Sequence, residues 1–152
     1  MPRLRETPEV RRKQLIDAAM RSIARYGYAG TTIETICDEA KVSRGLINHH
    51  FGSKEELIRQ SYKALRDEWM SQTHGSVLGS YREPEQQLQD MIRVSFGPTM
   101  FKPEYLGIWA GFWSAIGKSP ALRKLNRELF EKDREAYQQI FEAIGRKRGK
   151  PV

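Results

Sequence analysis

Arg44 and Asn48 are the side chains in this sequence best suited to reading DNA bases. They lie four residues apart, so on a helix both face the same surface. Arginine can donate two hydrogen bonds to guanine O6 and N7, and asparagine can pair in the same way with adenine. Ser43 and His49 add hydrogen-bonding groups beside them, and Gly45 has no side chain to hold a phosphate away. These residues predict a base-reading surface, although alone they would also suit the solvated side of an ordinary helix.

Two short helices are predicted around these residues, and they favour the interpretation as a base-reading surface. Apolar residues at i, i+3, i+4 and i+7 predict one buried stripe, with Thr32 before it as an N-cap. After a turn at residues 41–42, Ser43 can cap a second helix that turns Ile47 and Phe51 inward. Such a pair forms a helix-turn-helix, whose second helix can enter the major groove. The stripe consists of Ile33, Ile36, Cys37 and Ala40.

The distribution of charge fits a nucleic-acid partner. The 152 residues contain 26 Lys and Arg against 19 Asp and Glu, a net charge of +7, and the excess lies at the two ends of the chain. Near the helix-turn-helix, Thr32 and Lys54 are expected to hold phosphates. A basic arm beside it extends the electrostatic footprint. The arm contains Arg3, Arg5, Arg11, Arg12 and Lys13.

Residues 11–58 resemble the N-terminal domain of the tetracycline-repressor (TetR) family of bacterial transcription regulators. The residues that carry the resemblance are Ile23, Tyr26, Gly27, Tyr28, Thr31, Thr32, Ile33, Ile36, Ala40, Val42, Ser43, Gly45, His50, Phe51, Lys54, Glu55 and Leu57. Three positions depart from the family pattern: Cys37 replaces Ala, Lys41 replaces Gly and Asn48 replaces Tyr. If the turn keeps the geometry of the family, Lys41 must adopt a positive φ, which strains a residue with a side chain.

The remaining sequence predicts further helices and no strand. They are expected at about residues 8–26, 53–73, 84–96, 103–118 and 120–144, because proline or capping residues precede apolar residues at helical spacing. The predicted fold is all-α, with a three-helix head joined by a long helix to a C-terminal bundle. The resemblance implies a DNA-binding domain at residues 1–54 and an effector-binding and dimerisation domain at residues 55–152.

A second group of functional candidates lies in the helix at residues 103–118. Tyr105, Trp109, Phe112 and Trp113 give one stripe of unusual bulk. Such a stripe is most often core or a helix-packing surface, but its rings could also hold a cation. Trp109, Phe112 and Trp113, the following Pro120, and Asn48 in place of Tyr on the recognition helix resemble the betaine-regulator branch of the TetR family. That resemblance implies an inducer such as choline or another quaternary ammonium compound.

Assembly is expected to require two copies, because one head offers little contact and a dimer reads a palindromic operator. The resemblance implies further C-terminal helices, whereas this sequence ends in a basic tail at residues 145–152. Either the chain is a truncated form or it dimerises differently. The candidate pairing surface is on the last helix and consists of Leu122, Leu125, Leu129, Ala136, Tyr137, Ile140 and Ile144.

Other function classes are disfavoured. The single cysteine suits a reducing cytoplasm, and no apolar run is long enough for a transmembrane helix. Adjacent His49 and His50 diverge on a helix, and no grouping has metal-ligand spacing, so we expect no metal, no cofactor and no enzymatic activity. The sequence predicts a ligand-responsive repressor, possible targets being choline and glycine-betaine genes. The alternatives are a shortened helical regulator that acts by protein pairing, or a TetR-family repressor with an unrelated hydrophobic inducer.

Overall fold

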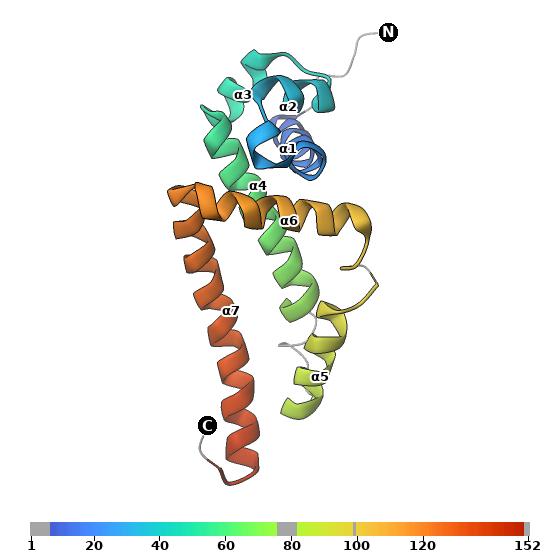
Figure 1. Cartoon of the computed structure of the whole chain (residues 1–152). Coiled ribbons are helices and arrows are strands. Elements are labelled where there is room, and N and C mark those ends of the chain that lie inside the picture. The colour runs from blue at the N-terminus through green and yellow to red at the C-terminus, as the bar shows by residue number, and fades with distance from the viewer. Residues whose placement is uncertain (1–6, 76–81, 99, 151–152) are drawn as a thin grey trace.

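A computed structural model describes residues 7–75, 82–98 and 100–150, and within these ranges every regular element is a helix. The all-α prediction is therefore confirmed. The head contains α1 (Pro8–Gly30), α2 (Ile33–Ala40) and α3 (Arg44–Phe51), and α4 (Lys54–Met70) leads away from it into a short π-helix, η1 (Ser71–Gly75). The other helices are α5 (Pro84–Ser95), α6 (Pro103–Lys118) and α7 (Pro120–Lys147). In Figure 1, α6 runs crosswise beneath the head, while α4, α5 and α7 extend away from it.

Local signals set the helix boundaries of the head. The Thr32 hydroxyl accepts the Thr35 backbone N–H at 3.2 Å, and the Thr32 backbone N–H donates to the Thr35 hydroxyl at 2.9 Å, so α2 begins with a capping box. Lys41 ends α2 in the left-handed conformation, with φ 55° and ψ 47°, as the family-like turn requires. Ser43 occupies the N-cap position of α3, but its side chain makes no capping hydrogen bond, so that expectation is wrong.

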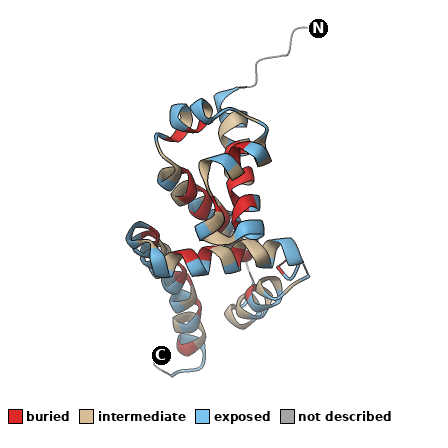
Figure 2. Cartoon of the chain, turned by 45° about the horizontal axis from the view of Figure 1, so that its top comes forward, coloured by how far each residue is buried: buried red, intermediate tan, exposed pale blue. Residues whose placement is uncertain are grey.

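Two hydrophobic cores meet along α4. Leu57 is fully buried in the head core with residues of α1, α2 and α3, while the adjacent Ile58 belongs to a second core formed with α6 and α7. α1 also contributes to both, since Met20 and Ile23 lie in the second core. Figure 2 shows the buried residues on the inward sides of these helices. The head is thus built directly onto the C-terminal helices through α1 and α4.

The apolar stripe of α7 faces the rest of the same chain. Leu122, Leu125, Ala136 and Ile140 are at most 9% exposed, because they pack against α4, α5 and α6. The prediction that these four residues form a pairing surface between copies is therefore wrong, and the other three predicted residues, Leu129, Tyr137 and Ile144, are half-buried. The exposed large apolar residues of α7 are Phe130 and Phe141.

Within the described ranges, no helix is long and apolar enough to cross a bilayer, and no three His, Cys, Asp or Glu side chains gather as metal ligands.

Candidate DNA interface and ligand pocket

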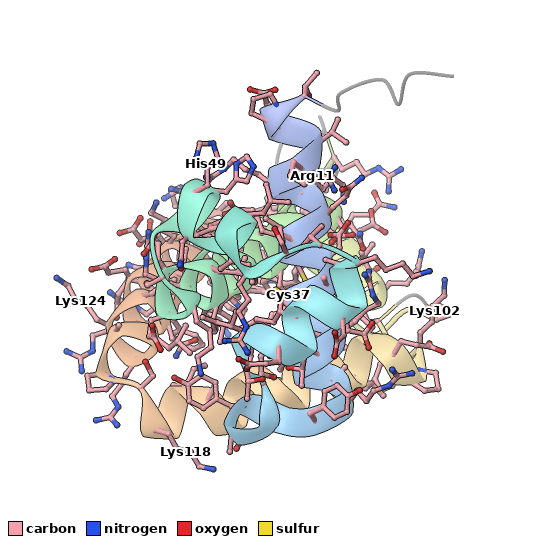
Figure 3. All side chains as sticks on the ribbon, turned by 90° about the horizontal axis from the view of Figure 1, so that it is seen from above. Arg11, Cys37, His49, Lys102, Lys118 and Lys124 are labelled. Carbon is pink, nitrogen blue, oxygen red and sulfur yellow. The ribbon has the colours of Figure 1, made fainter. Side chains whose placement is uncertain are left out.

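The predicted base-reading residues lie together on the outer side of α3. Ser43, Arg44, Gly45, Asn48 and His49 are all exposed, while the opposite side of the helix is buried in the head core. Figure 3 shows His49 at the rim of the head and Cys37 inside it. The arrangement leaves the polar side of α3 free to approach a nucleic acid.

Arg44 makes an ion pair that sequence reasoning missed. Its Nη2 atom lies 2.5 Å from Glu34 Oε1 of α2, and both side chains are more than half exposed. A hydrogen bond with the Thr32 hydroxyl, a backbone hydrogen bond and the charge of Arg44 lower the pKa of Glu34. Because an exposed ion pair is weakened by the surrounding water, Arg44 can leave Glu34 for a stronger partner.

The predicted phosphate-holding residues share one shallow groove. Thr32 at the N-cap of α2, Asn48 of α3 and Lys54 of α4 line it, together with Glu34, Glu55 and other residues at the starts of α2 and α4. The Lys54 ammonium donates to the Thr31 carbonyl at 3.2 Å, which holds it near the N-terminus of α2. The N-termini of α2 and α4 and the Lys54 ammonium offer hydrogen-bond donors to a phosphate, beside the carboxylates of Glu34 and Glu55 in the same groove.

The basic arm is only partly available for phosphates. Arg12 donates to the His50 carbonyl and to Gln60 Oε1, and its guanidinium carbon lies 4.4 Å from the centre of the Phe51 ring. Arg12 therefore ties α1 to α3 and α4, which corrects its predicted place in the arm. Lys13 pairs with Asp17 at 2.9 Å on the surface. Arg3 and Arg5 lie outside the described residues.

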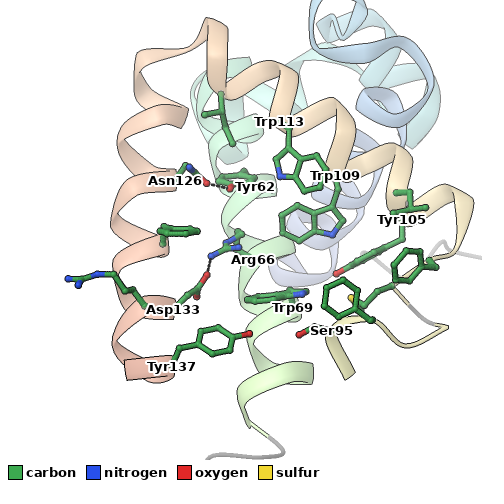
Figure 4. Close-up of a pocket in the computed structure, with 17 residues that line it drawn as sticks. Tyr62, Arg66, Trp69, Ser95, Tyr105, Trp109, Trp113, Asn126, Asp133 and Tyr137 are labelled. Atoms are coloured by element: carbon green, nitrogen blue, oxygen red, sulfur yellow. Dashed lines mark hydrogen bonds and ion pairs between the residues drawn. The ribbon is translucent and has the colours of Figure 1, made fainter. Parts of the chain in front are cut away.

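The C-terminal helices enclose a cavity of about 760 Å³. Side chains from α4, α5, α6 and α7 point into it, as Figure 4 shows. Tyr105, Trp109 and Trp113 follow one another along α6, with ring-centre distances of 6.2 and 5.9 Å between neighbours. Trp109 is buried, whereas Trp113 is 62% exposed at the open side of the cavity. These three of the four predicted ligand residues do line one site.

Phe112 does not line this cavity. It is fully buried, and its ring centre lies 5.1 Å from that of Tyr62 in the second core. The position follows from helical geometry, because residue 112 is rotated by about 100° from Trp113 toward the centre of the molecule. The structure thus places Phe112 in the core, apart from the three other predicted ligand residues.

Polar residues inside the cavity were also missed. Arg66 of α4 forms a buried ion pair with Asp133 of α7, and Tyr62 donates to Asn126 at 2.5 Å. Burial raises the pKa of the Tyr62 phenol and that of the Tyr105 phenol. The sequence carries a signal for each of these two residues. Arg66 follows Tyr62 by four positions and Asp133 follows Leu129 by four positions, so each charge lies within an apolar stripe.

Comparison with known proteins identifies the class. Residues 15–60 match the family described as "Bacterial regulatory proteins, tetR family". The chain is 35% identical over 118 residues to the HTH-type transcriptional regulator BetI of Burkholderia lata, a match that covers 77% of this chain and 60% of that protein. Residues 15–60 therefore belong to the TetR family. The chain spans about 60% of the length of the BetI relatives that it matches.

Solved structures share the fold. A protein of Pseudomonas aeruginosa PAO1 described as a transcriptional regulator superposes with a TM-score of 0.87 at 28% identity, covering 95% of this chain and 70% of that one. A Saccharomonospora viridis protein in complex with choline superposes with a TM-score of 0.72 at 22% identity, covering 93% and 72%. These matches confirm the predicted family and fold, and the matched family is one of regulatory proteins rather than enzymes.

Proposed function

We propose that this chain is a ligand-responsive transcriptional repressor of the bacterial cytoplasm, with a DNA-binding domain at residues 1–54 and an effector domain at residues 55–152. The observation that carries the proposal is the direct connection, through α4, between the exposed polar side of α3 and the aromatic cavity. Arg44 and Asn48 would read bases, with Ser43, Gly45 and His49 against the backbone and Thr32 and Lys54 on phosphates. A homodimer would place two heads on a palindromic operator.

The proposed inducer is choline or another quaternary ammonium compound. Trp69, Tyr105, Trp109 and Trp113 line the cavity, and their rings can stabilise a desolvated cation. The names of the BetI relatives and the choline complex of one structural neighbour support this ligand class. An inducer would lower operator affinity by favouring a position of α4 that fits DNA poorly.

A gel-shift with DNA from upstream of the chain's own gene tests the regulator, and calorimetry tests the ligand. Choline should bind and weaken the DNA complex. Its neutral isostere, which carries a tert-butyl group in place of trimethylammonium, should bind more weakly. Equal affinity for the two compounds would favour an unrelated hydrophobic inducer, and absence of DNA binding would contradict the repressor.

One observation favours a second candidate, a shortened regulator that acts by pairing with another protein. Phe130 and Phe141 leave apolar surface on α7 that this chain does not cover. A chain that forms a complex with a longer relative and does not bind DNA alone would support this candidate.

A further inference from the structure

The cavity already contains a cation that belongs to the protein. The guanidinium carbon of Arg66 lies 5.1 Å from the ring centre of Trp69 and 5.9 Å from that of Trp109. Figure 4 shows the Arg66 side chain reaching from α4 toward Asp133 of α7, beside these two indoles. Arg66 and Asp133 are 8% and 6% exposed. The two indole rings and the carboxylate that would stabilise a ligand cation are therefore already in contact with the positive charge of Arg66.

We propose that Arg66 occupies the cation position of the ligand-free pocket and that a ligand cation competes with it for the indole faces and for Asp133. This inference rests on the proposed cationic inducer. Arg66 is then the residue that limits the affinity for the inducer and transmits inducer binding to the head. In the ligand complex, the cation lies against Trp69 and Trp109, Asp133 neutralises it, and the Arg66 guanidinium moves toward the open side of the cavity.

The geometry of the Arg66–Asp133 pair favours replacement of Arg66 by a ligand cation. Arg66 Nε and Asp133 Oδ1 are buried and have no hydrogen-bond partner among the described residues, so the pair lacks the second bond of a bidentate contact. Unsatisfied buried polar atoms are costly, which reduces the net stability that the pair contributes. A ligand that releases Arg66 to solvent frees its Nε from this burial.

The competition also connects the pocket to the head. Arg66 lies on the same helix as Leu57, which is fully buried in the head core, and as Lys54, which lines the phosphate groove. While Arg66 holds Asp133, α4 is joined to α7 by this ion pair. Displacement of Arg66 removes this ion pair and leaves the Tyr62–Asn126 hydrogen bond and the apolar core between the two helices, so α4 can shift more easily relative to α7. Ligand binding and the position of the head are thereby linked through one side chain.

Calorimetry with choline on four proteins tests the competition. Arg66→Gln removes the internal cation and leaves Asp133, so it should raise choline affinity by about ten-fold, whereas Asp133→Asn should lower it by about the same factor. Lys63→Gln is the matched control, because Lys63 lies on the same helix as Arg66 but pairs with Asp67 at the surface, at 2.5 Å, and does not line the cavity. It should bind choline as the unmodified chain does.

A second comparison keeps the test decisive if the buried Asp133 prevents Arg66→Gln from folding. In the Asp133→Asn background, adding Arg66→Gln should again raise choline affinity, because the same competitor is removed from a neutral site. Unchanged or weaker binding after loss of Arg66, in a chain that otherwise binds choline, overturns the competition and leaves the proposed inducer intact. Binding of choline by none of the proteins overturns both.

Discussion

Gly111 of α6 lies directly against Ile23 of α1, closer than any side chain would permit. A Cβ added to Gly111 would be 2.3 Å from Ile23 Cγ2 and 3.0 Å from the Ile23 carbonyl oxygen. One turn earlier, Gly107 faces Ala24 at ordinary contact distance. The helix that carries the aromatic residues of the pocket is therefore packed onto the longest helix of the head without an intervening side chain.

Gly111→Ala should move α6 away from α1 and destabilise the chain by about 1–3 kcal/mol, the usual range for overpacking. The matched control is Gly117→Ala in the same helix, because a Cβ there meets nothing within 4 Å. That change should stabilise the chain by up to about 1 kcal/mol through helix propensity. Urea unfolding of the two variants measures both effects. Equal free energies of unfolding would show that the α1–α6 contact yields easily.

Asn48→Ala and Lys54→Ala should have different effects on DNA binding, the first on sequence preference and the second on overall affinity. Loss of Asn48 should cost about 1–3 kcal/mol at particular base pairs and relax the preference there. Loss of Lys54 should weaken binding to all sequences and reduce the slope of affinity against salt. Fluorescence anisotropy with operator and scrambled DNA separates the two. Lys118→Ala is the control, since Lys118 lies at the edge of the molecule opposite His49 in Figure 3. An unchanged preference after Asn48→Ala would contradict the assigned reading face.

The sequence predicts the head better than the pocket, for a physical reason. The start of α2 and the left-handed Lys41 depend on residues within a few positions of each other, so their signals are local. Phe112 and Leu125 belong to apolar stripes that were recognised, yet periodicity does not say which neighbour covers a stripe. Arg66 and Asp133 each stand out as a charge within an apolar stripe, but they are 67 positions apart, and only packing shows that the two charges meet.

Self-association of the chain can be tested with two α7 variants, one at a residue buried within the chain and one at an exposed residue. Leu125 is buried within the chain, so Leu125→Ala should lower the free energy of unfolding by about 2–5 kcal/mol. Phe141 is 42% exposed, so Phe141→Ser should leave the fold stable and weaken self-association. Sedimentation equilibrium and urea unfolding read these effects separately. A monomer at micromolar concentration in the unmodified chain would contradict the proposed homodimer, and its operator binding should then be weak.

The ligand assignment predicts opposite behaviour for two neighbours in sequence. Trp113 lines the cavity and is 62% exposed, so Trp113→Leu should cost little stability, while the loss of one ring face should weaken choline binding by about 0.5–2 kcal/mol. Phe112 is fully buried against Tyr62, so Phe112→Leu should lower the melting temperature while choline affinity stays close to that of the unmodified chain. Calorimetry and thermal unfolding on both variants provide the comparison. If Phe112→Leu impairs choline binding as strongly as Trp113→Leu does, the cation is not held by the cavity side of α6.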